Sequence, residues 1–200
     1  MMKIHILFYY VSIFFVTSCC IDSIQDCGGC TPPIVYESAK AVSWVTDVDQ
    51  PGELTYLDQF NPSNTIRLNR TGTSYDTCVG EPGCCTVFNG KISYLSGQRS
   101  GQSIVFMVET IRDVVNFSYI QNNDTAFLCR LYADTLVTVP RPNWSSAIFD
   151  TVYNSKSTLL LKLNDPTDTS AVLGLTTLDW IKGIGPSRIR WNDGSEYILQ

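Results

Sequence analysis

Hydrophobic and β-branched residues occur along most of the chain in short runs, and turn-forming residues separate these runs about every ten positions. Runs rich in Val, Ile, Thr, Tyr and Phe favour strands, whereas Asn, Asp, Gly and Pro favour turns. The predicted strands are residues 86–88, 91–95, 103–109, 116–120, 126–132, 136–139, 148–153, 158–163, 187–191 and 196–199. The predicted turns are 50–52, 61–63, 70–72, 81–83, 89–90, 100–101, 122–124, 164–166 and 192–194. This pattern predicts an all-β fold, mainly an antiparallel sheet arranged as a half-barrel or sandwich.

Two pairs of neighbouring runs predict hairpins. The first joins 116–120 to 126–132, and the second joins 187–191 to 196–199 across Asn192-Asp193-Gly194, a sequence suited to a tight turn. One or two short helices are also expected, at 37–45 and around 53–60.

Alternation within the runs predicts which side chains share a face. Because side chains alternate along a strand, Phe127, Cys129 and Leu131 should lie on one face and Arg130 on the other. By the same rule, Arg188 and Arg190 of the strand 187–191 should lie on one face, and Ile189 and Trp191 should lie on the opposite face.

The first twenty residues form a pattern of their own. Lys3 precedes an apolar run from residue 6 to 16 that is interrupted only by Ser12. A membrane-spanning helix needs about 20 apolar residues, so this run is too short to span a bilayer. Its length is typical of the hydrophobic part of a signal peptide.

The apolar run ends in Val16-Thr17-Ser18-Cys19, which resembles the lipobox of bacterial lipoproteins. The resemblance implies cleavage between Ser18 and Cys19 and lipidation of Cys19, which would attach the chain to a membrane. Multiple acyl chains anchor a protein far more firmly than one chain does. An ordinary secretory signal cut near Ser18 is the alternative. Cys20 is a poorer anchor because Cys19 would then occupy a position that favours small residues.

These features divide the chain into three parts. Residues 1–18 form the predicted signal peptide, residues 19–33 a lipidated cysteine with a flexible tether, and residues 34–200 a single β-rich domain. A flexible tether of this length spans about 20 Å root-mean-square, which would keep the domain close to the membrane surface.

Charge and histidine content exclude several classes of function. The net charge is −5, and removal of the signal peptide leaves 13 basic and 19 acidic residues, or −6. The charges form no basic stripe, so no nucleic-acid partner is expected. The single histidine, His5, lies in the signal peptide. The mature chain would therefore lack histidine bases and histidine-ligated zinc, and we expect no enzymatic activity, no catalytic residues, no metal and no cofactor.

The chain contains eight cysteines, which suits an oxidising compartment. Besides Cys19 and Cys20, the candidates for disulfide bonds are Cys27, Cys30, Cys78, Cys84, Cys85 and Cys129. Their spacing does not choose among the possible pairings. Cys27-x-x-Cys30 matches the spacing of a redox pair, but no βαβ pattern surrounds it. A zinc site formed by residues 27, 30, 84 and 85 is a further alternative, although adjacent cysteines fit tetrahedral zinc poorly.

The C-terminal part resembles the tail of small envelope lipoproteins of Bacteroidetes-type bacteria. The resemblance rests on Asp179-Trp180-Ile181-Lys182-Gly183-Ile184-Gly185-Pro186, on Arg190-Trp191-Asn192-Asp193-Gly194 with the closing strand, and on Phe149-Asp150-Thr151-Val152-Tyr153. It implies an envelope location, most simply the bacterial outer membrane, and a β-rich domain.

Three functions remain open from the sequence. The first is a non-enzymatic envelope protein of structural or interaction type, tethered to the membrane through Cys19 and contacting an envelope protein or lipid. The second is a carrier that binds an apolar ligand or lipid in a curved sheet, which would use the 12% aromatic content. The third is a hydrolase based on two carboxylates, for which no spacing in the sequence gives a clear pair.

Overall fold

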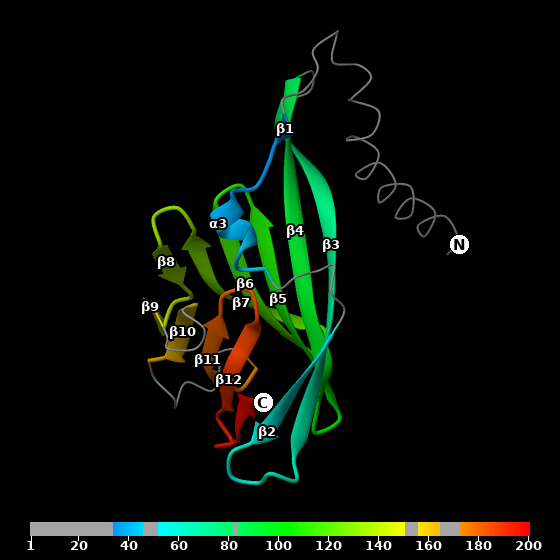
Figure 1. Cartoon of the computed structure of the whole chain (residues 1–200), viewed down its shortest axis with the longest axis vertical. Coiled ribbons are helices and arrows are strands. Elements are labelled where there is room, and N and C mark those ends of the chain that lie inside the picture. Colours follow the sequence, from blue (N-terminus) through cyan, green and yellow to red (C-terminus); the bar gives the residue numbers. More distant parts are fainter. Residues whose placement is uncertain (1–33, 46–51, 82–83, 151–155, 165–172) are drawn as a thin grey trace, which may run out of the picture.

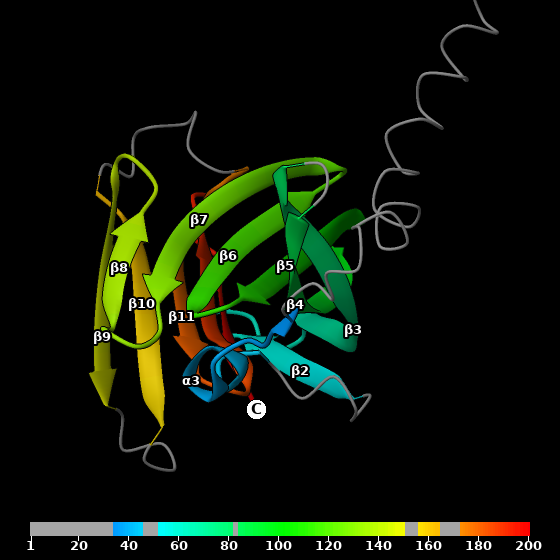
Figure 2. The same ribbon diagram turned by 90° about the horizontal axis from the view of Figure 1, so that it is seen from above.

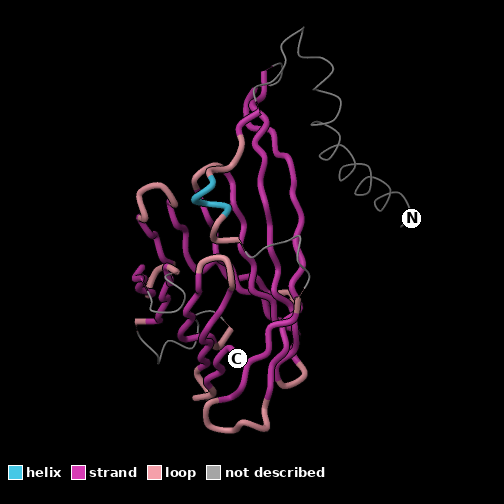
Figure 3. Tube along the Cα trace, in the orientation of Figure 1, coloured by secondary structure: helices cyan, strands magenta, loops and turns pink. Residues whose placement is uncertain are grey.

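The computed structural model describes residues 34–45, 52–81, 84–150, 156–164 and 173–200, with the backbone alone for residues 77–81, 84–85 and 150. Strands make up 70% of the structure, which confirms the all-β prediction. Figure 3 shows how strands dominate the trace beside one short helix. No helix within the described ranges is long and apolar enough to cross a membrane.

The strands form one sheet whose order differs from the chain order at a single point. They are β1 (Ile34–Val35), β2 (Glu53–Asp58), β3 (Thr65–Glu81), β4 (Cys84–Arg99), β5 (Gln102–Ile111), β6 (Val114–Gln121), β7 (Asp124–Tyr132), β8 (Val137–Pro140), β9 (Trp144–Asp150), β10 (Ser157–Leu163), β11 (Leu175–Ile181), β12 (Gly185–Trp191) and β13 (Glu196–Leu199). Their order is β8-β7-β6-β5-β4-β3-β2-β13-β12-β11-β10-β9. These neighbours pair antiparallel, and β1 joins β4 in parallel outside the series (Figure 1).

The sheet curls until it is nearly closed into a barrel, as the view from above shows (Figure 2). Its two end strands, β8 and β9, follow each other in the chain and come together at a seam. There the Ser146 hydroxyl donates a hydrogen bond of 2.8 Å to Thr138 Oγ1. The predicted antiparallel sheet is therefore present, and it is strongly curved.

Large side chains fill the inside of the curved sheet. The largest of those that are almost completely buried are Trp44, Trp180, Trp191, Tyr56, Tyr119, Phe106, Phe117, Ile66, Leu68, Leu95, Ile104 and Leu128. All of them belong to one continuous core cluster. Among the described residues, this filled interior argues against the hypothesis that a ligand is carried inside the sheet.

Helix α3 (Ala39–Val42) lies at one end of the curved sheet (Figure 2). Ser38 caps its first turn, because the Ser38 hydroxyl accepts a hydrogen bond of 3.1 Å from the Ala41 amide. Trp44 follows the helix and is completely buried, with its ring 6.1 Å from that of Phe117 in an edge-on arrangement. The helix predicted at 37–45 is thus confirmed in a shorter form, and it brings Trp44 into the core.

The helix predicted around 53–60 is wrong, because this segment contains strand β2. Tyr56 pairs with Ile66 of β3 on one side and with Leu199 of β13 on the other. Its ring is completely buried, and its hydroxyl donates to the Pro186 carbonyl at 2.8 Å. Two long-range strand pairings therefore override the local helical preference of this segment.

Strand β3 was not predicted, and β4 is much longer than the two short runs predicted within it. Together they form a hairpin arm that projects beyond β2 and β5 (Figure 1). The turns predicted at 70–72 and 89–90 are wrong, since both segments continue as strand. Gly90 explains one of them. The Tyr75 ring lies across Gly90, and a Cβ at that position would be 2.6 Å from Tyr75 Cζ. From there the Tyr75 hydroxyl donates to Glu109 of β5 at 2.7 Å.

Both predicted hairpins are confirmed, as β6–β7 and β12–β13. The predicted face of β7 is wrong at one residue. A register shift beside Phe117 places Cys129 opposite Phe117 and Phe127 opposite Ser118, which leaves Leu128 as an extra, buried residue. This bulge turns Phe127 outward, whereas Cys129 and Leu131 stay buried.

Candidate functional site

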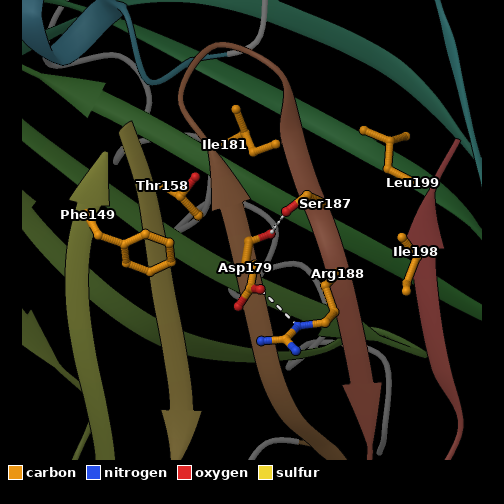
Figure 4. Close-up of a pocket in the computed structure, with 8 residues that line it drawn as sticks. All are labelled: Phe149, Thr158, Asp179, Ile181, Ser187, Arg188, Ile198 and Leu199. Carbon is orange, nitrogen blue, oxygen red and sulfur yellow. Dashed lines mark hydrogen bonds and ion pairs between the residues drawn. The ribbon is translucent and has the colours of Figure 1, made fainter. Parts of the chain in front are cut away.

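The described surface contains a pocket of about 510 Å³ on the outer face of the sheet, across β9 to β13. We call it the outer-face pocket. Figure 4 shows the side chains that line it, which are Phe149, Thr158, Asp179, Ile181, Ser187, Arg188, Ile198 and Leu199. They come from five strands, so the site depends on the register of the whole C-terminal half of the sheet.

Strand alternation explains why polar side chains reach this face. On β12, Ile189 and Trp191 point into the core. Arg188 directly precedes Ile189, so its side chain points outward. The outward direction of Arg188 and Arg190 is therefore confirmed. The pairing partner of Arg188 on β11 is Asp179, which points to the same face.

A bulge and a gap between strands shape the upper end of the pocket. The register shifts between Asp179 and Trp180, and the Ser187 hydroxyl donates to the Asp179 carbonyl at 3.3 Å. Pairing between β12 and β13 ends at Arg188 and Ile198. The next residues on these strands, Ser187 and Leu199, line the pocket where the two strands separate.

An ion-pair network starts in the pocket and extends beyond it along the sheet. Arg188 Nε donates to Asp179 Oδ2 at 2.8 Å, and Arg188 also lies 3.8 Å from Glu196, which in turn lies 4.0 Å from Arg190. The carboxylate side chains of Asp179 and Glu196 are only 14% and 12% exposed, whereas the two arginines are about half exposed. Two acidic and two basic groups are therefore combined, and their formal charges balance.

Asp179 has an unusual environment for a carboxyl group. Burial raises its pKa above the ordinary value of 3.8, the hydrogen bond and charge of Arg188 oppose this rise, and the charge of Glu196 adds to it. Its second oxygen, Oδ1, is buried and has no hydrogen-bond partner among the described residues. A buried polar atom without a partner costs roughly 1–3 kcal/mol, so a donor supplied by a ligand would be favourable here.

Apolar side chains flank this polar centre. Phe149 on β9 is 42% exposed and Ile198 on β13 is 37% exposed, both high values for large hydrophobic residues. Ile181 and Thr158 are almost completely buried between them. The pocket therefore combines an apolar lining with a few polar groups, which is the usual character of a small-molecule site.

The site residues expected from the sequence lie elsewhere. Ser18, Cys19, Cys27 and Cys30 are outside the described residues. Strand register places Cys78 opposite Val87, Cys85 opposite Gly80 and Cys84 opposite Glu81, all in the hairpin arm formed by β3 and β4.

Cys129, the remaining disulfide candidate, is a free thiol in the structure rather than half of a disulfide. It is completely buried in the core cluster, where apolar side chains surround it. This burial raises the pKa of the Cys129 thiol to about 12. A neutral, enclosed thiol of this kind is chemically inert at physiological pH.

The outer-face pocket was not predicted from the sequence. Alternation placed Arg188 on the outer face, but nothing local indicated that Asp179 and Phe149 lie on the same side of neighbouring strands. Within the described ranges, no group of three or more His, Cys, Asp or Glu residues could hold a metal ion.

No protein-family model, curated protein or solved structure matches this chain. The resemblance to Bacteroidetes-type envelope lipoproteins therefore stays a prediction that rests on the residues given above.

Proposed function

We propose that this chain is a lipid-anchored protein of the cell envelope that acts by binding, and that the outer-face pocket is its ligand site. The single observation that carries the binding role is the buried Oδ1 atom of Asp179, which lacks a partner in a pocket with apolar walls. The anchoring role is supported by the lipobox-like sequence that ends at Cys19.

The pocket favours a neutral ligand that has a polar side and an apolar side. Because Arg188 and Arg190 balance Asp179 and Glu196, a charged ligand would disturb an existing network. A hydroxyl or amide N–H of the ligand would donate to Asp179 Oδ1, and an apolar portion would rest against Phe149. Such a molecule would be held without any covalent step, which agrees with the expected lack of enzymatic activity.

Recovery of a co-purified ligand tests the binding role. Native protein is extracted from membranes with mild detergent, and bound small molecules are identified by mass spectrometry. We expect one class of neutral molecule in the wild-type protein and its loss in Asp179→Asn and Phe149→Ala. Val139→Ala is the matched control, because Val139 is also a large exposed residue but lies on β8, outside the pocket. Equal recovery from all four proteins, or no bound molecule in any of them, would refute the proposal.

The anchor is tested separately with Cys19→Ala. This variant should no longer incorporate labelled fatty acid, and it should leave the membrane fraction, because no acyl chain can then be attached. Cys20→Ala serves as the control and should keep both properties. Continued lipid labelling of Cys19→Ala would show that another residue carries the lipid.

A further inference from the structure

One long edge of the hairpin arm has no neighbouring strand among the described residues. On the side of β3 that faces away from β4, β2 pairs with β3 from Leu57–Thr65 up to Glu53–Asn69. Beyond Arg70, whose amide donates to the Gly52 carbonyl at 2.8 Å, no described residue pairs with β3 on that side. The free edge thus runs from Thr71 to Glu81, and Figure 1 shows it on the projecting arm.

The backbone groups that face this edge can be identified. The Arg70 amide points toward β2, and successive residues of a strand point their backbone groups to alternate sides. Gly72, Ser74 and Asp76 therefore direct their N–H and C=O groups to the free edge. All three residues are exposed. The Thr73 hydroxyl donates to the Ser74 carbonyl at 3.2 Å, which uses one of the two lone pairs of that oxygen.

Apart from Asp76, the edge lacks the features that usually prevent a sheet from pairing with another chain. Exposed edges are commonly protected by charged residues, above all lysine, by proline or by a bulge. Between Thr71 and Asp76 there is no lysine or proline, and the pairing of β3 with β4 shows no register shift. This stretch is rich in threonine, which favours extended backbone.

We propose that the free edge of β3 binds an extended segment of another protein as an added strand, with a lysine or arginine of that segment placed beside Asp76. Asp76 is exposed and is the one charged residue from Thr71 to Asp76. Its Oδ1 accepts a hydrogen bond of 2.7 Å from Asn89, which fixes the carboxylate on the strand. Opposite charges across neighbouring strands stabilise their pairing.

The same residue disfavours a second copy of this chain as the occupant. An antiparallel pair that uses the whole free segment, from Thr71 to Glu81, has Asp76 at its midpoint. The Asp76 carboxylates of the two copies would then lie directly opposite each other, and like charges at such positions are destabilising. A basic segment of a different protein meets no such repulsion. This inference is independent of the ligand proposed for the outer-face pocket.

A synthetic peptide tests the proposal with the full chain. The probe is a fluorescent ten-residue peptide of alternating threonine and valine with one central lysine, and its partner carries glutamate instead. Fluorescence anisotropy measures their affinities, and hydrogen exchange shows whether the amides of Gly72, Ser74 and Asp76 become protected. We expect the lysine peptide to protect these amides from exchange. We expect the glutamate peptide to bind about fivefold more weakly than the lysine peptide.

Two variants and one control separate the contribution of the backbone from that of the charge. Ser74→Pro removes an edge-facing amide, and proline is tolerated on a strand edge, so it should weaken the lysine peptide at least about tenfold. Ser74→Ala keeps the amide and should bind as the wild type does. Asp76→Lys should reverse the preference, so that the glutamate peptide binds more tightly than the lysine peptide. If circular dichroism shows that Ser74→Pro does not fold, the result for Asp76→Lys alone tests the proposal.

Three results would overturn the proposal. The first is no binding of the lysine peptide at concentrations up to about 1 mM. The second is binding that neither folded variant changes. The third is an edge-dependent dimer, detected by analytical ultracentrifugation and abolished by Ser74→Pro, which would assign the edge to a second copy.

Discussion

Arg99 links the end of β4 to the turn between β12 and β13. Arg99 lies over the Trp191 ring at 4.2 Å from its centroid and forms an ion pair with Asp193. Ser195 donates to Asp193 through both its amide and its hydroxyl, at 3.0 and 2.7 Å. These contacts tie the turn between β12 and β13 to the end of β4, far away in the sequence.

Asp193 should give the stability a defined pH dependence. Burial opposes its ionisation, but the hydrogen bonds from Ser195 and the Arg99 guanidinium outweigh it, so its pKa lies below the ordinary 3.8. A depressed pKa means that the stabilisation is present above the ordinary value and disappears as the pH falls through the folded value. Asp193→Asn should therefore be less stable than wild type at pH 7, by about 1 kcal/mol or less because the side chain is half exposed.

Urea denaturation at pH 7 and at pH 3 measures this effect. The difference between Asp193→Asn and wild type should shrink at the lower pH. Asp134→Asn is the control, since Asp134 forms an exposed ion pair with Lys40 at 3.6 Å and should change stability little. A gap for Asp193→Asn that stays constant between the two pH values would contradict this account.

At the scale of elements, the sequence predicted those strands whose turns carry clear signals. Asn122-Asn123 has positive φ at both residues and Gly194 has φ +85°, so the turn chemistry and the backbone agree in both predicted hairpins. Gly72 and Gly90 were predicted as turn residues but lie inside strands. At Gly90 the ring of Tyr75 on the neighbouring strand occupies the space of a side chain, and no local sequence pattern contains that neighbour.

The outer-face pocket could not be predicted from the sequence for a related reason. Alternation gives the face of a side chain on its own strand, as it did for Arg188. It does not give the register between strands, which pairs Arg188 with Asp179 and brings Phe149 opposite Thr158. A bulge also breaks alternation, as Leu128 did for Phe127. The fold class could therefore be predicted, but the composition of the site could not.

Gly90→Ala tests how the hairpin arm is held to β5. The new Cβ would lie 2.6 Å from the Tyr75 ring and 2.8 Å from the Thr110 carbonyl oxygen, so we expect a loss of about 1–3 kcal/mol in unfolding free energy. In a Tyr75→Ala background the loss should be smaller, because only the contact with Thr110 remains. Thermal and urea unfolding of the four proteins in this cycle give the coupling. Equal losses in both backgrounds would show that the ring does not limit the space.

At the scale of the whole molecule, the sheet is held together by strands from opposite parts of the chain. β13 lies between β12 and β2, so Tyr197 pairs with Ile189 on one side and with Asp58 on the other. The ring of Tyr197 also packs edge-on against Trp191, with their centroids 5.7 Å apart. Apart from the seam between β8 and β9, the N-terminal and C-terminal halves of the sheet therefore join through one four-residue strand.

Removal of residues 196–200 should abolish the fold. β2 and β12 would lose their common neighbour, and the core would open beside Trp191 and Tyr56. Far-UV circular dichroism and resistance to limited proteolysis should both be lost. Removal of Gln200 alone is the control and should have little effect, because this residue is exposed and adds one backbone hydrogen bond to Thr55. A protease-resistant product of the longer truncation would contradict this role of β13.

The place of β13 also sets when this protein can fold. Residues 196–199 are synthesised after the other described strands, yet they occupy the middle of the sheet. A chain whose last residues have not yet left the ribosome therefore lacks the strand that pairs with both β2 and β12. Folding dominated by such distant pairings is slow, commonly milliseconds to seconds. Until β13 is in place, β2 and β12 both have an unpaired edge, and such incompletely paired sheets are prone to aggregation.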